Sequence, residues 1–485
     1  MDGQVTAGTL ICAIPMSALV SWVDSRLAEL GTVLVGVMQQ FFSEGVCPAT
    51  THQLECRLEE CVREFARLCA QWGFNSLEPK DVEAMPARIE HSGDTYRRLS
   101  TKTPHSKILT RFGNITLTRA MYRRGSRGRT ISPLEKILGI ECGATPGAQD
   151  FVGRQVAAAG SSQGRCMEVI AERTGAKIGS EKLRNISSHL VDIMEPQREL
   201  CQVQQLEEWI DQAERAGKNV TLGVSRDGVS LGIAPFGNFE MASVATLSVY
   251  ADGKRTGTVY LAAAPEENQE SLSRNFTSLL KAIIRSRGSK FSRIVYVSDA
   301  GKIETAYWKK VLRCLFVDGK RIRIYRVVDY YHASQRLTTI ADSLLLTAAQ
   351  RQKWLSRVRK LLLQPGGWGR VMRSIASMKE IYGIEPAKND AFETAKRYLH
   401  RYRRFMNYAE TRSHGSPIGS GIVESACKQI VTERLKLSGM RWTHAGAAQI
   451  MTLRSILLSQ TWDATYHKSL IASTAVNNLS TQQTL

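Results

Sequence analysis

The segment from Lys218 to Asp329 constrains the fold most, because its short apolar runs have the length and composition of β-strands. The strand-like runs cover 219–225, 229–234, 242–251, 257–263, 293–298 and 321–328. Helical patterns fill about 268–287 and 304–314 between the later runs. Strands that alternate with helices require parallel pairing through helical crossovers. We therefore predict an α/β fold with a mixed central sheet.

The order of three strands, helix, strand, helix, strand and helix fits a ribonuclease H-like catalytic core. Residues 335–412 contain no convincing strand and are dense in cations, which predicts an all-helical insertion into that core. The predicted regions are a mainly helical N-terminal region (1–100), a DNA-end-binding region (101–215), the first part of the core (216–334), the insertion (335–412), the C-terminal part of the core (413–465) and a polar tail expected to be disordered (466–485).

The first 215 residues carry two helical signals. Leu54, Leu58, Val62, Phe65 and Leu68 lie at helical spacing with charges between them, which predicts an amphipathic helix. Farther along, an apolar-periodic segment ends at Gly175 and a second helix is expected to begin at Ser180, which resembles a helix-turn-helix. Many helical hairpins share this pattern, so contact with DNA at this segment is one interpretation of two.

The apolar stretch Thr9–Val20 has no basic residue before it and is interrupted soon after by charged residues. A secretory signal needs a basic start and a membrane span needs a longer apolar run, so neither is predicted. We expect a buried helix instead, in a protein without membrane contact. None of the ten cysteines forms a CxxC pair, which indicates thiols of a reducing cytoplasm and excludes a zinc ribbon.

The charge of the chain favours a polyanionic partner. Sixty-five Lys and Arg against 45 Asp and Glu give a formal net charge of +20. Cations that neutralise phosphates release condensed counterions, which favours binding to nucleic acid. A basic cluster at Arg119, Arg123, Arg124, Arg127 and Arg129 is equally compatible with phosphate contact and with a solvated loop.

Three acidic residues have the setting expected of metal ligands. Asp227 and Asp299 each follow a predicted strand and stand beside a small residue, Gly228 or Ala300. Glu424 follows the Gly419–Gly421 turn at the start of a predicted helix. Hard divalent cations bind carboxylate oxygens, and a pair of such ions can cleave phosphodiesters. The alternative interpretation is that these acids are ordinary turn and helix-start residues.

Two further groups of residues are candidates for the same chemistry. Asp329 and His332 lie three residues apart at a strand-to-helix junction, where the histidine could contact the scissile phosphate. The basic segment that follows Glu424 could bind phosphates and stack on an exposed base. Its candidate DNA-binding residues are Lys428, Arg434, Lys436, Arg441 and Trp442. A structural histidine and a helix that ends in a glycine turn explain these two patterns without DNA.

The segments 417–428 and 434–442 closely resemble the C-terminal motif of bacterial insertion-sequence DDE transposases, most of all the Kra-type group within the Mutator-like superfamily. The dipeptide Asp227-Gly228, the segment 298–300 and the segment 329–332 occur in the order of that family. The resemblance covers about residues 105–465. It departs from the family in lacking a clear zinc-binding cysteine pattern near the N-terminus.

The resemblance implies a catalytic and metal-binding triad of Asp227, Asp299 and Glu424, with Asp329 and His332 as auxiliary residues. It implies two Mg²⁺ (or Mn²⁺) ions, and as partners the terminal inverted repeats of a transposon and a target DNA. A homodimer or higher oligomer on DNA, associated with the nucleoid, is expected. Asp252, Asp318 and Glu410 are nearby acids that could displace a triad member, but none lies in a matching motif.

Two alternatives use the same residues differently. A ribonuclease H-like nuclease or resolvase would cut with the same carboxylates and transfer no strand. A catalytically inactive DNA-binding derivative would keep the basic surface alone. The intact acids at all three motif positions argue against the inactive derivative.

Overall fold

The computed structural model describes residues 16–235, 238–287, 291–344, 346–382 and 390–476. The chain divides into two compact units, one of Met1–Pro196 with Tyr466–Leu485 and one of Gln197–Thr465. Both contain helices and strands, so the fold is mixed α/β as predicted. In the part that is described, no helix is both long and apolar enough to cross a membrane.

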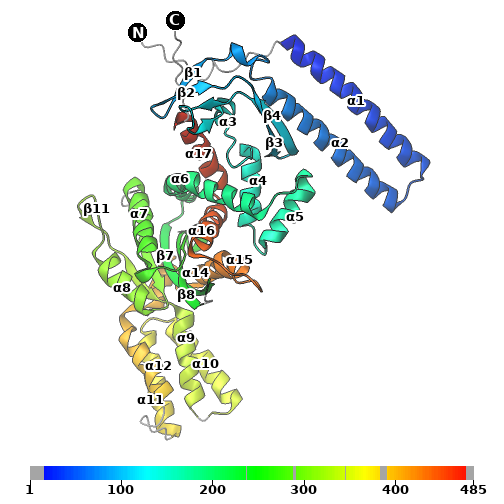
Figure 1. The fold of residues 1–485 in the computed structure, drawn as a ribbon. Helices are drawn as coiled ribbons and strands as arrows, with labels where there is room; N and C mark the ends of the chain where they lie inside the picture. The colour runs from blue at the N-terminus through cyan, green and yellow to red at the C-terminus, as the bar shows by residue number, and fades with distance from the viewer. Residues whose placement is uncertain (1–15, 236–237, 288–290, 345, 383–389, 477–485) are drawn as a thin grey trace. The chain divides into compact units, whose positions relative to one another are not determined.

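The first unit begins with a helical hairpin of α1 (Met16–Ser43) and α2 (Pro48–Asn75) (Figure 1). The described part of the apolar N-terminal stretch lies in α1, and the prediction that it forms a buried helix is wrong, because Val20 is half exposed. Residues 9–15 of that prediction lie outside the described residues. The amphipathic helix expected around Leu54–Leu68 is α2.

Strands follow where the N-terminal region was expected to be mainly helical. β1 (Arg88–His91) and β2 (Asp94–Arg98) pair as a hairpin. Ser92 and Gly93 both have positive φ at its two-residue turn, the conformation that matches the twist of paired strands. β5 (Tyr122–Arg123) and β6 (Thr130–Ile131) extend this sheet, while β3 (Thr103–Thr110) and β4 (Gly113–Arg119) form a second hairpin.

The helices of the first unit are α3 (Pro133–Ile137), α4 (Pro146–Ala157), α5 (Gln163–Thr174) and the beginning of α6 (Ser180–Arg215). The helices expected on either side of Gly175 are present, and this glycine adopts the left-handed conformation that ends α5.

The expectation of a disordered tail is wrong for its described part, because α17 (Trp462–Val476) is helical. Tyr466 anchors this helix by donating a 2.8 Å hydrogen bond to the Pro146 carbonyl. Residues 477–485 of that prediction lie outside the described residues.

The second unit is built on a five-stranded sheet in the order β13-β10-β7-β8-β9. β7 (Val220–Ile233), β8 (Asn238–Ala251) and β9 (Lys254–Ala263) pair antiparallel, whereas β10 (Arg293–Ser298) and β13 (Tyr325–Val328) run parallel to β7. The predicted mixed sheet is therefore present. The first two expected strand runs form one continuous strand, β7.

Helices cover both faces of the sheet. Ile294 and Tyr296 of β10 join the apolar core of α7 (Glu270–Arg287) and α8 (Lys302–Lys310). Val295 and Val297 face the opposite way, into the core of α9 (Tyr330–Ser343). This alternation is the two-residue period of a strand buried on both faces. β11 (Phe316–Val317) and β12 (Lys320–Arg321) form a small separate hairpin.

The described residues of 335–412 contain helices and no strand. After α9 come α10 (Ala348–Leu362), α11 (Gly367–Tyr382), α12 (Asp390–Arg401) and α13 (Tyr408–Ser413) (Figure 1). α14 (Gly421–Ala426), a π-helical segment (Cys427–Thr432) and α15 (Glu433–Leu435) then follow without a break. α16 (His444–Leu458) packs against β9 and completes the unit.

Candidate active site

Asp227 lies within β7 and not at the strand end predicted from the sequence. On one side, β8 continues past it and pairs Asp227 with Val244. On the other side, the pairing of β10 with β7 reaches only Val297 opposite Ser225. If the register of this last pair is continued by two residues along β7 and β10, Asp227 lies opposite Asp299. The shorter parallel strand thus leaves the Asp227 side of β7 open at the carboxyl edge of the sheet.

Asp299 follows β10 as predicted, and a tight turn fixes its carboxylate. The Gly301 N–H donates a 2.8 Å hydrogen bond to Asp299 Oδ1. A side chain at Gly301 would begin only 2.4 Å from Glu304 Oε2 and 3.2 Å from Asp299 Oδ1, so any larger residue here would push on both carboxylates. Tyr398 of α12 donates a 2.8 Å hydrogen bond to the Asp299 carbonyl. An aromatic side chain of the helical segment therefore supports the turn that carries this acid.

Asp329 is fully buried and joins two parts of the site. Its Oδ1 accepts a 2.7 Å hydrogen bond from the His332 backbone N–H, which caps α9. Its Oδ2 accepts a hydrogen bond from the Ser420 backbone N–H and lies 2.7 Å from the Ser420 hydroxyl. With its oxygens engaged in this way, Asp329 positions the loop before α14. We assign it a positioning role within the site.

Glu424 lies in the first turn of α14, with its side chain 48% exposed. Its Oε1 is 2.8 Å from the Ser420 hydroxyl and 3.5 Å from His332 Nε2. Ser420 therefore lies within hydrogen-bond reach of both Asp329 and Glu424. A side chain at Gly419 would begin 2.8 Å from the Tyr331 ring, so the glycine of this motif lets the loop approach α9.

The charges of two predicted triad acids act on the third. Burial raises the pKa of Asp227 to about 6; the Gly228 N–H opposes this shift, and the charges of Asp299 and Glu424 add to it. Carboxylates interact in this way only when they are close in space. Asp299 and Glu424, which are far from Asp227 in the sequence, therefore lie near enough to it for their charges to act on its carboxylate.

Two residues beside these acids were missed from the sequence. Glu304, in the first turn of α8, is buried; burial raises its pKa, and Asp299 and Asp227 raise it further. The thiol of Cys427 is hydrogen-bonded to Asp227, and its pKa is raised by burial first and then by the nearby carboxylates. The spacing of Cys427 from Glu424, about one helical turn, was the available signal.

The donor set suits a hard divalent cation, since it consists of carboxylate oxygens. As the described side chains stand, no three or more His, Cys, Asp or Glu residues are arranged to hold a metal ion. The hydrogen bonds explain this arrangement, because Glu424 is turned towards Ser420 and His332. Its exposed side chain can rotate, whereas Asp227 and Asp299 are held by backbone N–H groups. Glu424 is therefore the acid that must reorient for the three to share an ion.

The three other acids considered from the sequence have structural partners elsewhere. Asp252 accepts a 3.1 Å hydrogen bond from the Asn219 N–H, in the turn between β8 and β9. Asp318 forms a 2.9 Å ion pair with Arg285, and Glu410 forms a 2.8 Å ion pair with Arg293. These hydrogen bonds and ion pairs explain the presence of the three acids without a role in the candidate active site.

The candidate DNA-binding residues fall into two groups. Lys428, Lys436 and Arg441 are exposed and can reach phosphates. Arg434 and Trp442 are buried, and the Trp442 indole N–H donates a 3.0 Å hydrogen bond to the Leu435 carbonyl. The Trp442 carbonyl also accepts a hydrogen bond from the Ala234 N–H just beyond β7. Base stacking by Trp442 and phosphate contact by Arg434 are thus excluded in this conformation.

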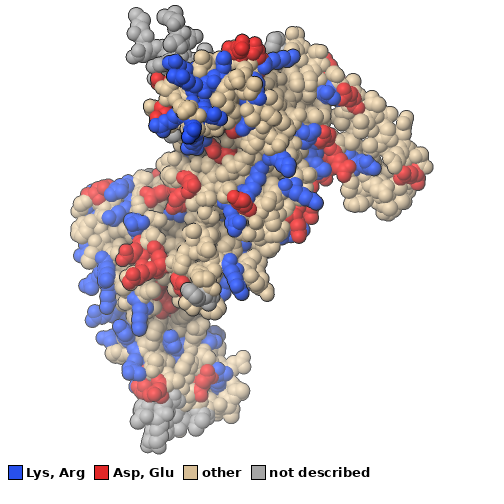
Figure 2. Space-filling view, in the orientation of Figure 1, with Lys and Arg blue, Asp and Glu red and all other residues tan. Residues whose placement is uncertain are grey.

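Lys and Arg side chains gather on the visible surface over β1, β2 and α3 in the first unit, and over α8 in the second (Figure 2). In the first unit, a pocket of about 560 Å³ is lined by Arg124, Arg129, Lys136 and Asp94, among others, and Arg124 forms a 2.9 Å ion pair with Asp94. Arg119 is not part of this surface, because it is buried in a 2.7 Å ion pair with Glu135.

No protein-family model matches the chain, and no curated protein matches it in sequence.

Proposed function

We propose that the chain is a DDE-type DNA transposase that cleaves DNA at transposon ends and joins the ends to a target DNA. The observation that carries the proposal is the convergence of three acids from β7, the end of β10 and α14, in which Asp299 and Glu424 both raise the pKa of Asp227. These are the acids at the three positions of the transposase-like motifs.

The topology of the second unit supports the proposal. An antiparallel three-stranded meander extended by two parallel strands, with a helical segment before the third acid, is the arrangement expected of a ribonuclease H-like core with an insertion. Fold alone does not specify function. The stronger support comes from the acids at the carboxyl edge of this sheet, where ligands of α/β folds bind.

On this proposal Asp227, Asp299 and a reoriented Glu424 hold Mg²⁺ or Mn²⁺, and two bound ions would supply an activated nucleophile and stabilise charge on the phosphate. The chain itself supplies position. Asp329 holds Ser420 through the Ser420 backbone N–H, which leaves the one hydroxyl proton of Ser420 available to Glu424 Oε1; His332 Nε2 lies 3.5 Å from the same oxygen. Once Glu424 turns to the ions, His332 Nε2 is free to donate a hydrogen bond to a phosphate oxygen.

The proposed partners are transposon ends and target DNA, bound by a homodimer or higher oligomer of a nucleoid-associated cytoplasmic protein. The net charge of +20 and the exposed Lys428, Lys436 and Arg441 beyond Glu424 support a polyanionic ligand. The pocket of the first unit adds Arg129 as a second place for phosphate contact, whereas its Arg124 and Lys136 form ion pairs with Asp94 and Glu141.

The test compares the full chain with Asp227→Asn on labelled duplexes taken from the DNA that flanks its gene, in Mg²⁺ and in Mn²⁺. We expect the variant to lose cleavage and to keep DNA binding, because the substitution removes one ligand charge and leaves the basic surface unchanged. Asp318→Asn is the matched control and should cleave normally, since Asp318 pairs with an arginine at the exposed surface. Undiminished cleavage by Asp227→Asn would overturn the assignment.

A second assay separates strand transfer from simple hydrolysis. A duplex with a pre-cut 3′-hydroxyl end is incubated with the protein, a divalent cation and a supercoiled plasmid. A transposase joins the end to the plasmid, whereas a nuclease or resolvase with the same carboxylates only cuts. Binding without either reaction would identify an inactive DNA-binding derivative.

A further inference from the structure

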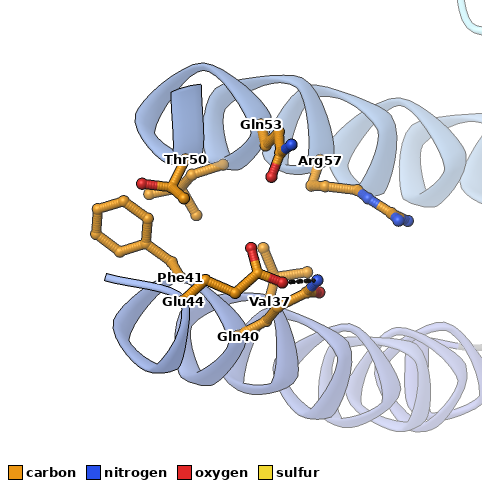
Figure 3. Close-up of a pocket in the computed structure, with 8 residues that line it drawn as sticks. Val37, Gln40, Phe41, Glu44, Thr50, Gln53 and Arg57 are labelled. Atoms are coloured by element: carbon orange, nitrogen blue, oxygen red, sulfur yellow. Dashed lines mark hydrogen bonds between the residues drawn. The ribbon is translucent and has the colours of Figure 1, made fainter. Parts of the chain in front are cut away.

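The helical hairpin of the first unit buries few of its apolar side chains and leaves many of them exposed. α2 contains no buried residue, and α1 is apolar along most of its length. Between the two helices near the turn lies a pocket of about 410 Å³, in which Val37 and Phe41 of α1 face Thr50 and Gln53 of α2 (Figure 3). Helices in proteins are stabilised mainly by burying an apolar face, and this hairpin buries little of its own.

Most of the large exposed apolar side chains of α1 lie in one stripe along the helix. The exception is Val33, which lies on another side. The members of the stripe are Val20, Leu27, Val35, Met38 and Phe42, with Gly31 between them. The side chains are exposed by between 37% (Met38) and 66% (Phe42). Successive positions are seven, four, four, three and four residues apart, the spacing of a coiled-coil seam. We call this stripe the α1 seam.

The α1 seam is distinct from the side of α1 that faces α2. Leu30, Leu34, Val37 and Phe41 are less exposed and lie on that other side. Trp22 also points towards α2, where it stacks on Trp72 at 4.6 Å between ring centres. Two apolar stripes on one helix require two partners. α2 is the first partner, and the α1 seam is open to a second.

The order of residues in the seam identifies the second partner. Positions at equal distances on either side of Gly31 are matched: Leu27 with Val35, and Val20 with Phe42. An antiparallel copy of the same helix would therefore place Leu27 against Val35 and Val20 against Phe42, and the same contacts would recur by symmetry. Such self-complementarity is the property of a two-fold interface.

Gly31 fits the centre of this arrangement. A Cβ built there meets no atom within 4 Å, so nothing in the described part of the chain covers it. Where two helices cross at a pair of glycines, their backbones can approach closely. The charged residue on the seam side is Asp24, which would face Met38 of the copy. The seam therefore carries no like-charge pair that would repel a second copy.

The seam is also large enough for a dimer. From Val20 to Phe42 it runs for about 33 Å of helix. Five partly exposed side chains on each of two copies supply on the order of 1,000 Å² of buried area, near the lower limit of a specific interface. We propose that two copies of this chain dimerise by antiparallel pairing of their α1 seams, with the two-fold axis at Gly31.

This inference rests on the oligomer named in the proposed function and assigns the surface that forms it. It can fail while the proposed catalysis stands, because its test uses neither DNA nor a divalent cation. The mass of the full chain in solution is measured over a range of micromolar concentrations by light scattering and sedimentation. We expect a dimer. Leu27→Glu should weaken it by about 100-fold or more, because each symmetric dimer loses two buried leucines. Ser25→Glu adds the same charge to the exposed side of α1 away from the seam and should leave the dimer intact.

Mixing two variants tests the antiparallel register. Leu27→Glu and Val35→Lys should each be largely monomeric, but their mixture should form heterodimers, since the carboxylate introduced in one copy then faces the ammonium introduced in the other. A mixture of Leu27→Glu with Leu27→Lys should not, because those positions would meet only in a parallel pair.

Three results would overturn the inference: a monomeric wild-type chain, dimerisation of Leu27→Glu as tight as that of the wild type, or an antiparallel mixture that stays monomeric. A monomeric chain whose α1 seam binds phospholipid vesicles, and not a second copy of the chain, would overturn it as well.

Discussion

Removing the charge of Asp227 should stabilise the metal-free protein at neutral pH. Burial and the neighbouring acids raise the pKa of Asp227 from 3.8 to about 6 in the folded chain. Each pKa step of one corresponds to about 1.4 kcal/mol, so keeping this carboxylate ionised in the folded state costs about 3 kcal/mol. Asp227→Asn removes that cost and keeps an oxygen that can accept the Gly228 N–H hydrogen bond.

The effect has a defined dependence on pH. Because the folded pKa lies above the unfolded one, the folded state binds the proton more tightly between about pH 4 and 6. The stability of the wild type relative to Asp227→Asn should therefore fall as the pH rises through this window and stay low above it. Below about pH 3 both states are protonated and the difference should vanish.

Differential scanning calorimetry in a chelator measures this difference. For a unit of this size each kcal/mol changes Tm by about 2 °C, so Asp227→Asn should melt about 6 °C higher at pH 7 and at the same temperature as wild type near pH 3. Asp318→Asn should change Tm little at either pH, because that carboxylate is exposed. Equal Tm values for wild type and Asp227→Asn at pH 7 would refute the reasoning.

A divalent cation should narrow this difference and, in large excess, reverse it. An ion that binds only the folded state stabilises it by about 1.4 kcal/mol at ten times its Kd, which offsets about half of the 3 kcal/mol, and by about 4.1 kcal/mol at 1,000 times its Kd, which exceeds it. We expect Mn²⁺ to raise the Tm of the wild type and to have little effect on Asp227→Asn. If Asp227→Asn is more stable than the wild type without Mn²⁺ but loses this advantage with Mn²⁺, then Asp227 serves ion binding at the expense of folding stability.

Three further sets of substitutions test other parts of the site. Asp329→Asn should lower stability by about 1 to 3 kcal/mol and also reduce cleavage, because it disturbs the hydrogen bonds to Ser420; normal activity and Tm would contradict its positioning role. Gly301→Ala should reduce cleavage by up to about 100-fold without weakening DNA binding, since its methyl group would push on the carboxylates of Glu304 and Asp299. Trp442→Ala should lower the free energy of unfolding by about 3 to 5 kcal/mol. Arg441→Ala should leave Tm unchanged and reduce by about one the slope of log K for DNA binding against log salt concentration. A Trp442→Ala variant that is stable but binds DNA poorly would place the tryptophan on the DNA-binding surface.

The sequence alone was sufficient to place Asp299 and Asp329 at strand ends, because each directly follows an apolar run of strand length. It was insufficient for Asp227. Its neighbour β8 continues past this residue while β10 stops short of it, and a strand sequence does not contain the lengths of its partners. The Ser92-Gly93 turn was readable in principle, since a Ser-Gly dipeptide marks a turn and here separates two short strands.

Glu424 could not be assigned from periodicity, because an acid in the first turn of a helix is common for electrostatic reasons alone. The resemblance of its flanking glycines to a family motif singled it out. The burial of Trp442 was missed for a different reason. The basic residues around it indicate a surface, but its hydrogen bonds to Leu435 and Ala234 arise only when the segment packs against the end of β7.

The most direct test of the account is a crystal structure of the wild-type chain with Mn²⁺, with the ions located by their anomalous scattering. We predict manganese between Asp227 and Asp299, with the Glu424 side chain turned away from Ser420 to complete the ligand set. Manganese bound elsewhere, or held by the two aspartates while Glu424 keeps its contact with His332, would contradict the central claim that these three acids act together.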